Sequence, residues 1–168
     1  MWSRVLRFVL GFVGAAVAWY NLTPQYDRLL AAAVTPLVRF DSRLRSAELA
    51  ATARIIQVTG DLPAANIPAD QLTYNVILLV ALFASNRRPV DRRNAVGFLV
   101  ASAIVVALHV LAVLLSVEST YAARMGTWSD AHYGAAGYYF WVYGEIFYRL
   151  VGMFGVVFVC WWATINRR

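Results

Sequence analysis

The sequence predicts an all-α membrane protein with four transmembrane helices and a small extracytoplasmic α+β segment between helices 1 and 2. Apolar residues make up 61% of the 168 residues and charged residues only 14%, against about 25% charged in a typical soluble domain. The mean hydropathy of +0.59 excludes a disordered chain. The apolar residues form runs too long for core helices, and the length suits one domain of about four spans.

The first span is predicted over residues 1–22, where an apolar run follows Arg4 and Arg7. A cleaved secretory signal is the alternative, because Ala16-Val17-Ala18 has the small-x-small pattern of a cleavage site. Trp19 and Tyr20 follow directly and resemble the aromatic belt of a membrane interface. The pattern therefore favours an uncleaved signal anchor.

Residues 23–70 form the one long polar segment, with five arginines against five acidic residues. Such a balanced loop suits the extracytoplasmic side. Apolar residues at helical spacing predict an amphipathic helix over 25–40, kinked or divided at Pro36. Residues 53–59 are rich in β-branched side chains and predict a strand, paired with 47–51. Two strands alone are marginal in water, so they need a partner surface.

The rest of the chain alternates spans with short loops. We predict a short second span over 71–86, a third over 94–117 and a fourth over 137–165, with an extracytoplasmic loop over 118–136 and a cytoplasmic tail over 166–168. The cytoplasmic loop over 87–93 carries the strongest topology signal, namely Arg87, Arg88, Arg92 and Arg93. By the positive-inside rule, both termini and this loop are cytoplasmic.

Ionisable side chains inside a span are costly and mark candidate functional sites. His109, Glu145 and Arg149 fall inside predicted spans, and Asn75 adds a polar group at similar depth. Glu145 and Arg149 are spaced i,i+4, so they form an ion pair on one helix face. This polar cluster could fix helix packing, contact a polar group of a partner protein, or act as a general base or proton relay.

The fourth predicted span is dense in aromatic residues and glycines. This pattern suits an interfacial aromatic belt with packing residues, or a face for a lipid or a partner helix. The candidate face comprises Tyr139, Trp141, Gly144, Phe147, Tyr148 and Gly152.

Several function classes are not expected. All 15 basic residues are arginine, and their place beside the spans marks topology rather than a nucleic-acid surface. Cys160 is the single cysteine, so an intramolecular disulfide and a cysteine metal cluster are excluded, and this residue suits a small hydrophobe. With two histidines in different settings and no metal-binding motif, we expect no metal and no cofactor.

The layout resembles a known family. A first span ends in Trp19-Tyr20, a strand-forming segment follows, and the chain re-enters the membrane through Leu72-Thr73-Tyr74-Asn75 and an apolar tail to Ala84. This layout is similar to the small membrane proteins encoded beside exosortases, the exosortase H-associated type in particular. The resemblance implies a bacterial inner-membrane accessory to a transpeptidase-like protein-sorting system. Exosortases use Cys, Arg and His on the outer side, whereas Cys160 is predicted near the cytoplasmic end, so this chain does not resemble the enzyme itself.

We therefore expect a non-enzymatic accessory or scaffold subunit of a membrane complex. Its expected partners are membrane lipids and a membrane protein of the exosortase type. The alternative is an intramembrane enzyme or small transporter that uses His109, Glu145 and Arg149.

Overall fold

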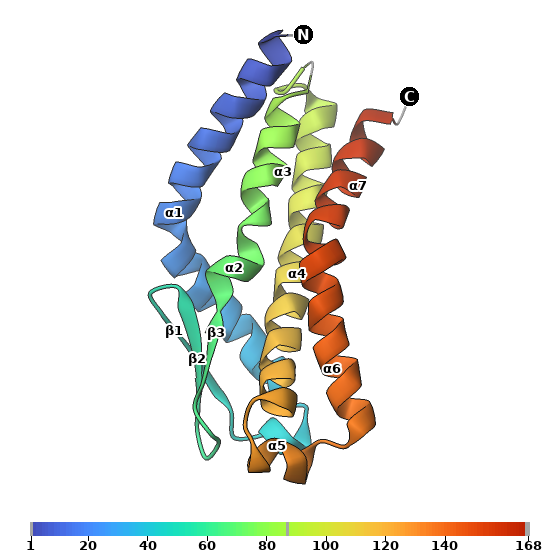
Figure 1. Ribbon diagram of the computed structural model, residues 1–168. Coiled ribbons are helices and arrows are strands. Elements are labelled where there is room, and N and C mark those ends of the chain that lie inside the picture. The colour runs from blue at the N-terminus through green and yellow to red at the C-terminus, as the bar shows by residue number, and fades with distance from the viewer. Residues whose placement is uncertain (1, 87, 167–168) are drawn as a thin grey trace.

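The computed structural model describes residues 2–86 and 88–166. The predicted topology arginine at position 87 and the last two tail residues, 167–168, lie outside the described residues. The chain is mostly helical and carries one three-stranded sheet. Long helices run side by side, and the sheet packs at the end opposite the two termini (Figure 1).

The first helix is longer than expected, because α1 (Trp2–Val38) runs unbroken through both the predicted span and the predicted amphipathic helix. Pro24 and Pro36 lie inside it. A proline removes one backbone hydrogen bond, but Pro36 stands two residues before the helix ends. The apolar face keeps its period across both prolines, and its second half is buried against the sheet and α4 at Leu30, Ala31, Val34 and Val38.

The sheet contains three antiparallel strands in the order β1 (Glu48–Thr52), β2 (Ile55–Thr59) and β3 (Ala65–Pro68). The expected pairing of the first two strands is present. The second strand begins two residues later than predicted, because Ala53, with φ of +57°, and the next residue form the turn. The third strand was not predicted, and it supplies part of the partner surface that a two-stranded hairpin lacks.

The second predicted span is divided into α2 (Ala69–Thr73) and α3 (Asn75–Ala84). The third is α4 (Arg92–Ala123), which continues six residues into the predicted loop before the short helix α5 (Thr127–His132). The fourth consists of α6 (Ala135–Phe147), a π-helical turn η2 (Tyr148–Gly152) and α7 (Met153–Asn166). A 3₁₀ turn, η1 (Ser42–Leu44), links α1 to the sheet.

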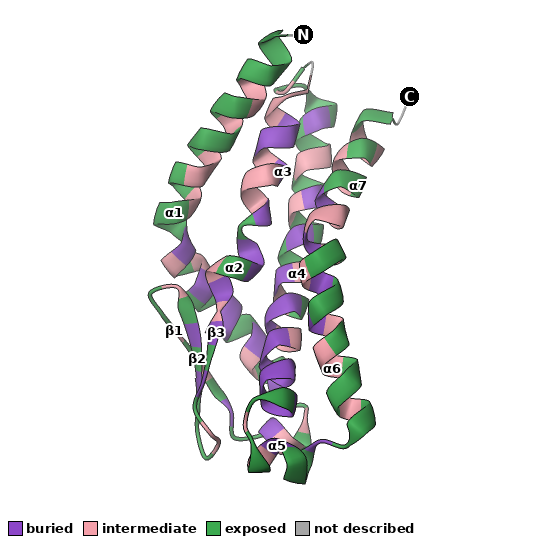
Figure 2. Cartoon of the chain, viewed as in Figure 1, coloured by how far each residue is buried: buried purple, intermediate pink, exposed green. Residues whose placement is uncertain are grey.

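Two apolar cores lie one above the other. At the arginine-rich end, α3, α4 and α7 enclose a small core built from Leu79, Leu82, Phe83, Ala101, Val105 and Val157. At the sheet end, a larger core joins the second half of α1, the sheet, α2 and the second half of α4. Figure 2 shows that burial along α4 concentrates at this sheet end, where α4 is surrounded.

Three helical stretches are long and apolar enough to cross a membrane: Trp2–Val38, Arg92–Ala123 and Ala135–Asn166. Residues Ala69–Ala84 form a shorter apolar stretch. In the apolar 18-residue stretch of α1 only 6% of the residues are buried, and in the corresponding stretch of α4 33% are buried. These helices therefore present apolar side chains outward, which is compatible with a membrane location.

Candidate interhelical polar site

His109 is the centre of a hydrogen-bonded chain that joins four helices. The hydroxyl of Tyr26 on α1 lies 2.7 Å from His109 Nδ1, and His109 Nε2 lies 2.6 Å from Asn75 Oδ1. Asn75 Nδ2 donates to the carbonyl of Met153 at 2.7 Å. The amide orientation of Asn75 fixes the tautomer of His109. The amide oxygen Oδ1 can only accept, so the imidazole proton is on Nε2, and Nδ1 accepts from the Tyr26 hydroxyl.

This chain of Tyr26, His109, Asn75 and the Met153 carbonyl is called the His109 chain below. His109 is fully buried and Asn75 is 1% exposed. Both ring nitrogens of the histidine are occupied within the protein. The local backbone aids the arrangement: Asn75 opens α3 directly after the break at Tyr74, and Met153 opens α7 directly after the π-helical turn. The His109 chain thus ties α1, α3, α4 and α7 together.

Glu145 and Arg149 form a second group that does not contact His109. Arg149 Nη2 lies 2.8 Å from Glu145 Oε1, and Ser116 on α4 donates to the same oxygen at 2.9 Å. Ser116 lies seven residues beyond His109, about 10 Å along α4. No hydrogen bond or ion pair joins the two groups within residues 2–86 and 88–166. The four polar residues expected to lie together are therefore divided into two levels.

The candidate partner face also divides in two. Tyr148 is buried and its hydroxyl donates to the Leu72 carbonyl at 3.0 Å. Trp141 packs against the larger core, and a Cβ on Gly144 would stand 3.1 Å from Leu115 of α4. Gly152 is half-buried, and a Cβ there would stand 3.2 Å from the Tyr148 ring. These four residues lie at the interior side of the helix.

Tyr139 and Phe147 lie on the opposite, exposed side together with three neighbours outside the predicted face. Positions 139, 143, 146, 147 and 150 follow the i, i+4, i+7, i+8, i+11 spacing of one helix face. We call this face the α6 stripe: Tyr139, Tyr143, Ile146, Phe147 and Leu150. Its members range from 44% to 75% exposed.

At the sheet end, a third polar group joins the turn after α1 to α4 and to the segment before α6. Arg43 pairs with Asp41, and its guanidinium lies 3.9 Å from the centre of the Tyr133 ring. Tyr133 donates to the buried carboxyl of Glu118 at 2.7 Å. The Arg43 guanidinium holds the pKa of Asp41 below its usual range. Burial, and then the bond to Glu118, raises the pKa of Tyr133.

Asp27 on α1 is a buried carboxylate outside these groups. Its side chain is fully buried, and neither oxygen has a hydrogen-bond partner among the described residues. The indole nitrogen of Trp19, two helical turns away on the same face, is likewise without a partner in the described part of the chain. An unpaired buried polar group costs free energy.

At the opposite end, the predicted topology arginines Arg88, Arg92 and Arg93 lie around the start of α4, close to the chain termini (Figure 1). Cys160 lies on α7 toward this same end and is a free, half-buried thiol. No group of three or more His, Cys, Asp or Glu side chains able to hold a metal occurs among the residues that the structure describes.

Sequence reasoning missed six side chains of these groups: Tyr26, Ser116, Asp41, Arg43, Glu118 and Tyr133. Their types are common at helix ends and surfaces, so no local pattern distinguishes them. Asp27 carried a usable signal, since it recurs with the apolar residues of the second half of α1 at i+3, i+4 and i+7.

The fold and the sites together define a mostly helical protein whose apolar helices are compatible with a membrane location. Comparison with protein-family models, with curated proteins and with solved structures finds no match to this chain.

Proposed function

We propose that this protein is a multi-pass inner-membrane scaffold subunit that holds a partner membrane protein against its α6 stripe. The single observation that carries the proposal is the height of this exposed aromatic stripe above the arginine-rich end.

By the positive-inside rule, we take the arginine-rich end of the molecule as the cytoplasmic boundary of the membrane. With the ends of α1, α4 and α7 at the cytoplasmic face, a hydrocarbon layer of about 30 Å takes about 20 residues of each helix. For α4 this layer ends near Val113. The sheet end, with its larger core, then projects on the extracytoplasmic side. In this placement α2 and α3 together form the shortest of the four crossings, over Ala69–Ala84.

The α6 stripe extends past that layer. Counted from Asn166, Phe147 lies about 28 Å up the helix, Tyr143 about 35 Å and Tyr139 about 40 Å. Lipid tails therefore cover the lower end of the stripe, whereas Tyr143 lies at the level of the lipid headgroups and Tyr139 at their outer edge. Contiguous exposed apolar surface of this kind is typical of a protein-protein contact. Arg149 sits beside Ile146 and is one-third exposed, so it offers a charged donor to a carboxylate of the partner.

The His109 chain supports a scaffold in another way. The alternative of an enzyme or transporter requires His109, Glu145 and Arg149 to share one site. They lie on two levels, and His109 has no free ring nitrogen and no exposed surface. Hydrogen bonds that join four helices suit a rigid frame.

We carry the partner class over from the family resemblance and propose a transpeptidase-like sorting enzyme of the exosortase type. The test replaces Tyr143 or Phe147 with a photo-crosslinking phenylalanine analogue in native membranes. Leu10 and Val13, exposed apolar residues of α1, serve as matched lipid-facing controls. We expect one discrete protein adduct from the stripe positions and none from the controls, with mass spectrometry giving the partner class.

The double variant Tyr143→Ser/Phe147→Ser should abolish co-purification of that same partner, whereas Leu10→Ser/Val13→Ser should leave it intact. Equal protein crosslinking from α1 and α6, or only lipid adducts from the stripe, would refute the proposed docking face. An adduct to a protein of another class would refute the sorting assignment and leave the scaffold role standing.

A further inference from the structure

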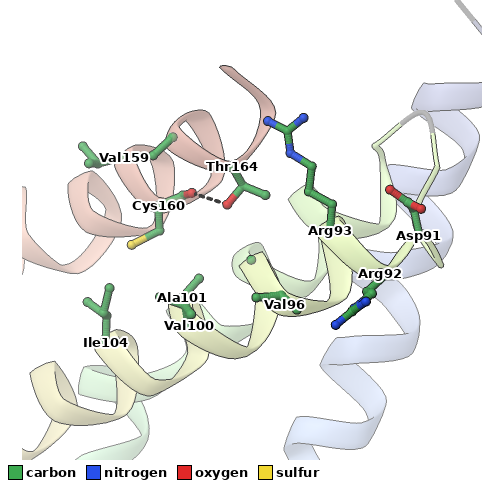
Figure 3. Close-up of a pocket in the computed structure, with 12 residues that line it drawn as sticks. Asp91, Arg92, Arg93, Val96, Val100, Ala101, Ile104, Val159, Cys160 and Thr164 are labelled. Carbon is green, nitrogen blue, oxygen red and sulfur yellow. Dashed lines mark hydrogen bonds between the residues drawn. The ribbon is translucent and has the colours of Figure 1, made fainter. Parts of the chain in front are cut away.

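A groove between α4 and α7 lies at the arginine-rich end and has a volume of about 670 Å³. Its walls are exposed aliphatic side chains: Val96, Val100 and Ile104 on α4 face Val159 on α7. Figure 3 shows Ile104 at one end of the groove and the arginines at the other. The groove is thus apolar along most of its length. Its end at Arg92 and Arg93, called the mouth below, is cationic.

Close helix contact forms the floor of the groove. A Cβ on Gly97 would overlap the side chain of Thr164, so glycine at this position lets α4 approach α7 closely. Ala101 and Ala163 keep the neighbouring lining small. From Val96 to Ile104 the helix rises about 12 Å, which is most of the roughly 15 Å thickness of one hydrocarbon leaflet.

The mouth carries an excess of positive charge. Arg92 and Arg93 line it together with one carboxylate, Asp91. A second depression shares Asp91 and Arg93 and adds Arg4 and Arg88. Neither the Arg92 nor the Arg93 side chain takes part in a hydrogen bond or ion pair among the described residues. Arg92 and Arg93 outnumber the one carboxylate at the groove, and Arg4 and Arg88 border the adjoining depression, which favours an anion at the groove mouth.

The backbone around the mouth is held in place. The buried side chain of Asn94 donates to the Pro89 carbonyl at 2.7 Å, and Asn86 accepts from the indole of Trp161 at 2.8 Å. Asn86 and Asn94 are also hydrogen-bonded to each other. These bonds fix the turn before α4 against α7, so the cationic mouth needs little ordering when a ligand binds.

We infer that this groove is a seat for one anionic phospholipid, with an acyl chain between α4 and α7 and the phosphate at Arg92 and Arg93. The inference rests on the membrane placement proposed above, and it is independent of the partner at the α6 stripe. A zwitterionic lipid offers the same chain but no net charge, so selectivity comes from the arginines.

The test uses the full-length protein in phosphatidylcholine nanodiscs that contain traces of a lipid with a photoactivatable acyl chain. The probe is phosphatidylglycerol in one arm and phosphatidylcholine in the other. We expect phosphatidylglycerol adducts to concentrate on the peptides of residues 96–104 and 159–163. Unlabelled phosphatidylglycerol should compete for this labelling, and unlabelled phosphatidylcholine should not.

Two sets of changes test the headgroup contact and the acyl-chain contact of the lipid separately. Arg92→Gln/Arg93→Gln should reduce the preference for phosphatidylglycerol by about fivefold per guanidinium, or roughly thirtyfold in total. The control Arg28→Gln/Arg124→Gln removes the same charge from exposed positions elsewhere and should leave the preference unchanged. Ala163→Trp fills the groove and should remove labelling of its lining by both lipids.

Equal labelling of the groove by both lipids, or an unchanged preference in Arg92→Gln/Arg93→Gln, would overturn the lipid seat while leaving the membrane placement intact. Labelling that spares α1, α4 and α7 in every arm would instead refute the placement itself, and with it the lipid seat.

Discussion

Replacing Asn75 with leucine should destabilise the helix bundle, because Asn75 connects His109 on α4 to the carbonyl of Met153 on α7. The change removes two hydrogen bonds and leaves the Nε2–H group of a fully buried histidine without an acceptor. A buried donor left without a partner costs about 1–3 kcal/mol. The lost bond to Met153 adds about 1 kcal/mol. The expected loss in free energy of unfolding is therefore about 2–4 kcal/mol.

A double-mutant cycle tests whether the His109 chain acts as a unit. His109→Leu alone leaves Asn75 Oδ1 and the Tyr26 hydroxyl unpaired. The double variant Asn75→Leu/His109→Leu removes both partners of the central bond, so it should cost about 1–2 kcal/mol less than the sum of the single changes. The assay is unfolding of the purified protein in mixed micelles, at increasing fractions of a denaturing detergent.

Thr73→Val is the matched control. Thr73 is also fully buried and polar, but its hydroxyl bonds only within its own helix, to the Ala69 carbonyl at 3.1 Å. We expect a cost below about 1 kcal/mol for this control. Two results would show that the His109 chain does not hold the helices together. One is that the effects of the two single changes add up in the double variant, and the other is that Asn75→Leu costs no more than Thr73→Val.

Three further predictions follow from the other contacts. Gly97→Ala should cost about 1–3 kcal/mol of stability in the same unfolding assay, because its Cβ would overlap a threonine of α7. Arg149→Met should destabilise the protein more than Arg149→Met/Glu145→Gln, because the single change leaves a buried carboxylate unpaired; the reverse order in thermal melts would contradict this. The pKa of Asp41 is lowered by Arg43, so the stability that the pair contributes should be present above about pH 4, the unfolded value, and be lost as pH falls through the folded value. Asp41→Asn should flatten this acid limb in melts measured from pH 7 to pH 3.

The sequence by itself determined the mostly helical class, the approximate places of the long apolar helices and the pairing of the first two strands. Long apolar runs and clustered arginines are local properties, so the helices and the pairing of residues 47–51 with 53–59 could be read along the chain. The same holds for the Glu145–Arg149 pair, whose i,i+4 spacing is enough to bring the side chains together on one helix.

Only the tertiary structure decided which groups share a site. His109 was predicted beside Glu145, yet its partners come from α1 and α3, because helix rotation and vertical offset are set by packing among four helices. The same packing turned Tyr148 inward and left Phe147 exposed, one residue apart. It also brought α4 into close contact with α7 at Gly97, and the side chains beside this contact line a groove next to Arg92 and Arg93. Such contacts join residues far apart in the chain, and no local periodicity encodes them.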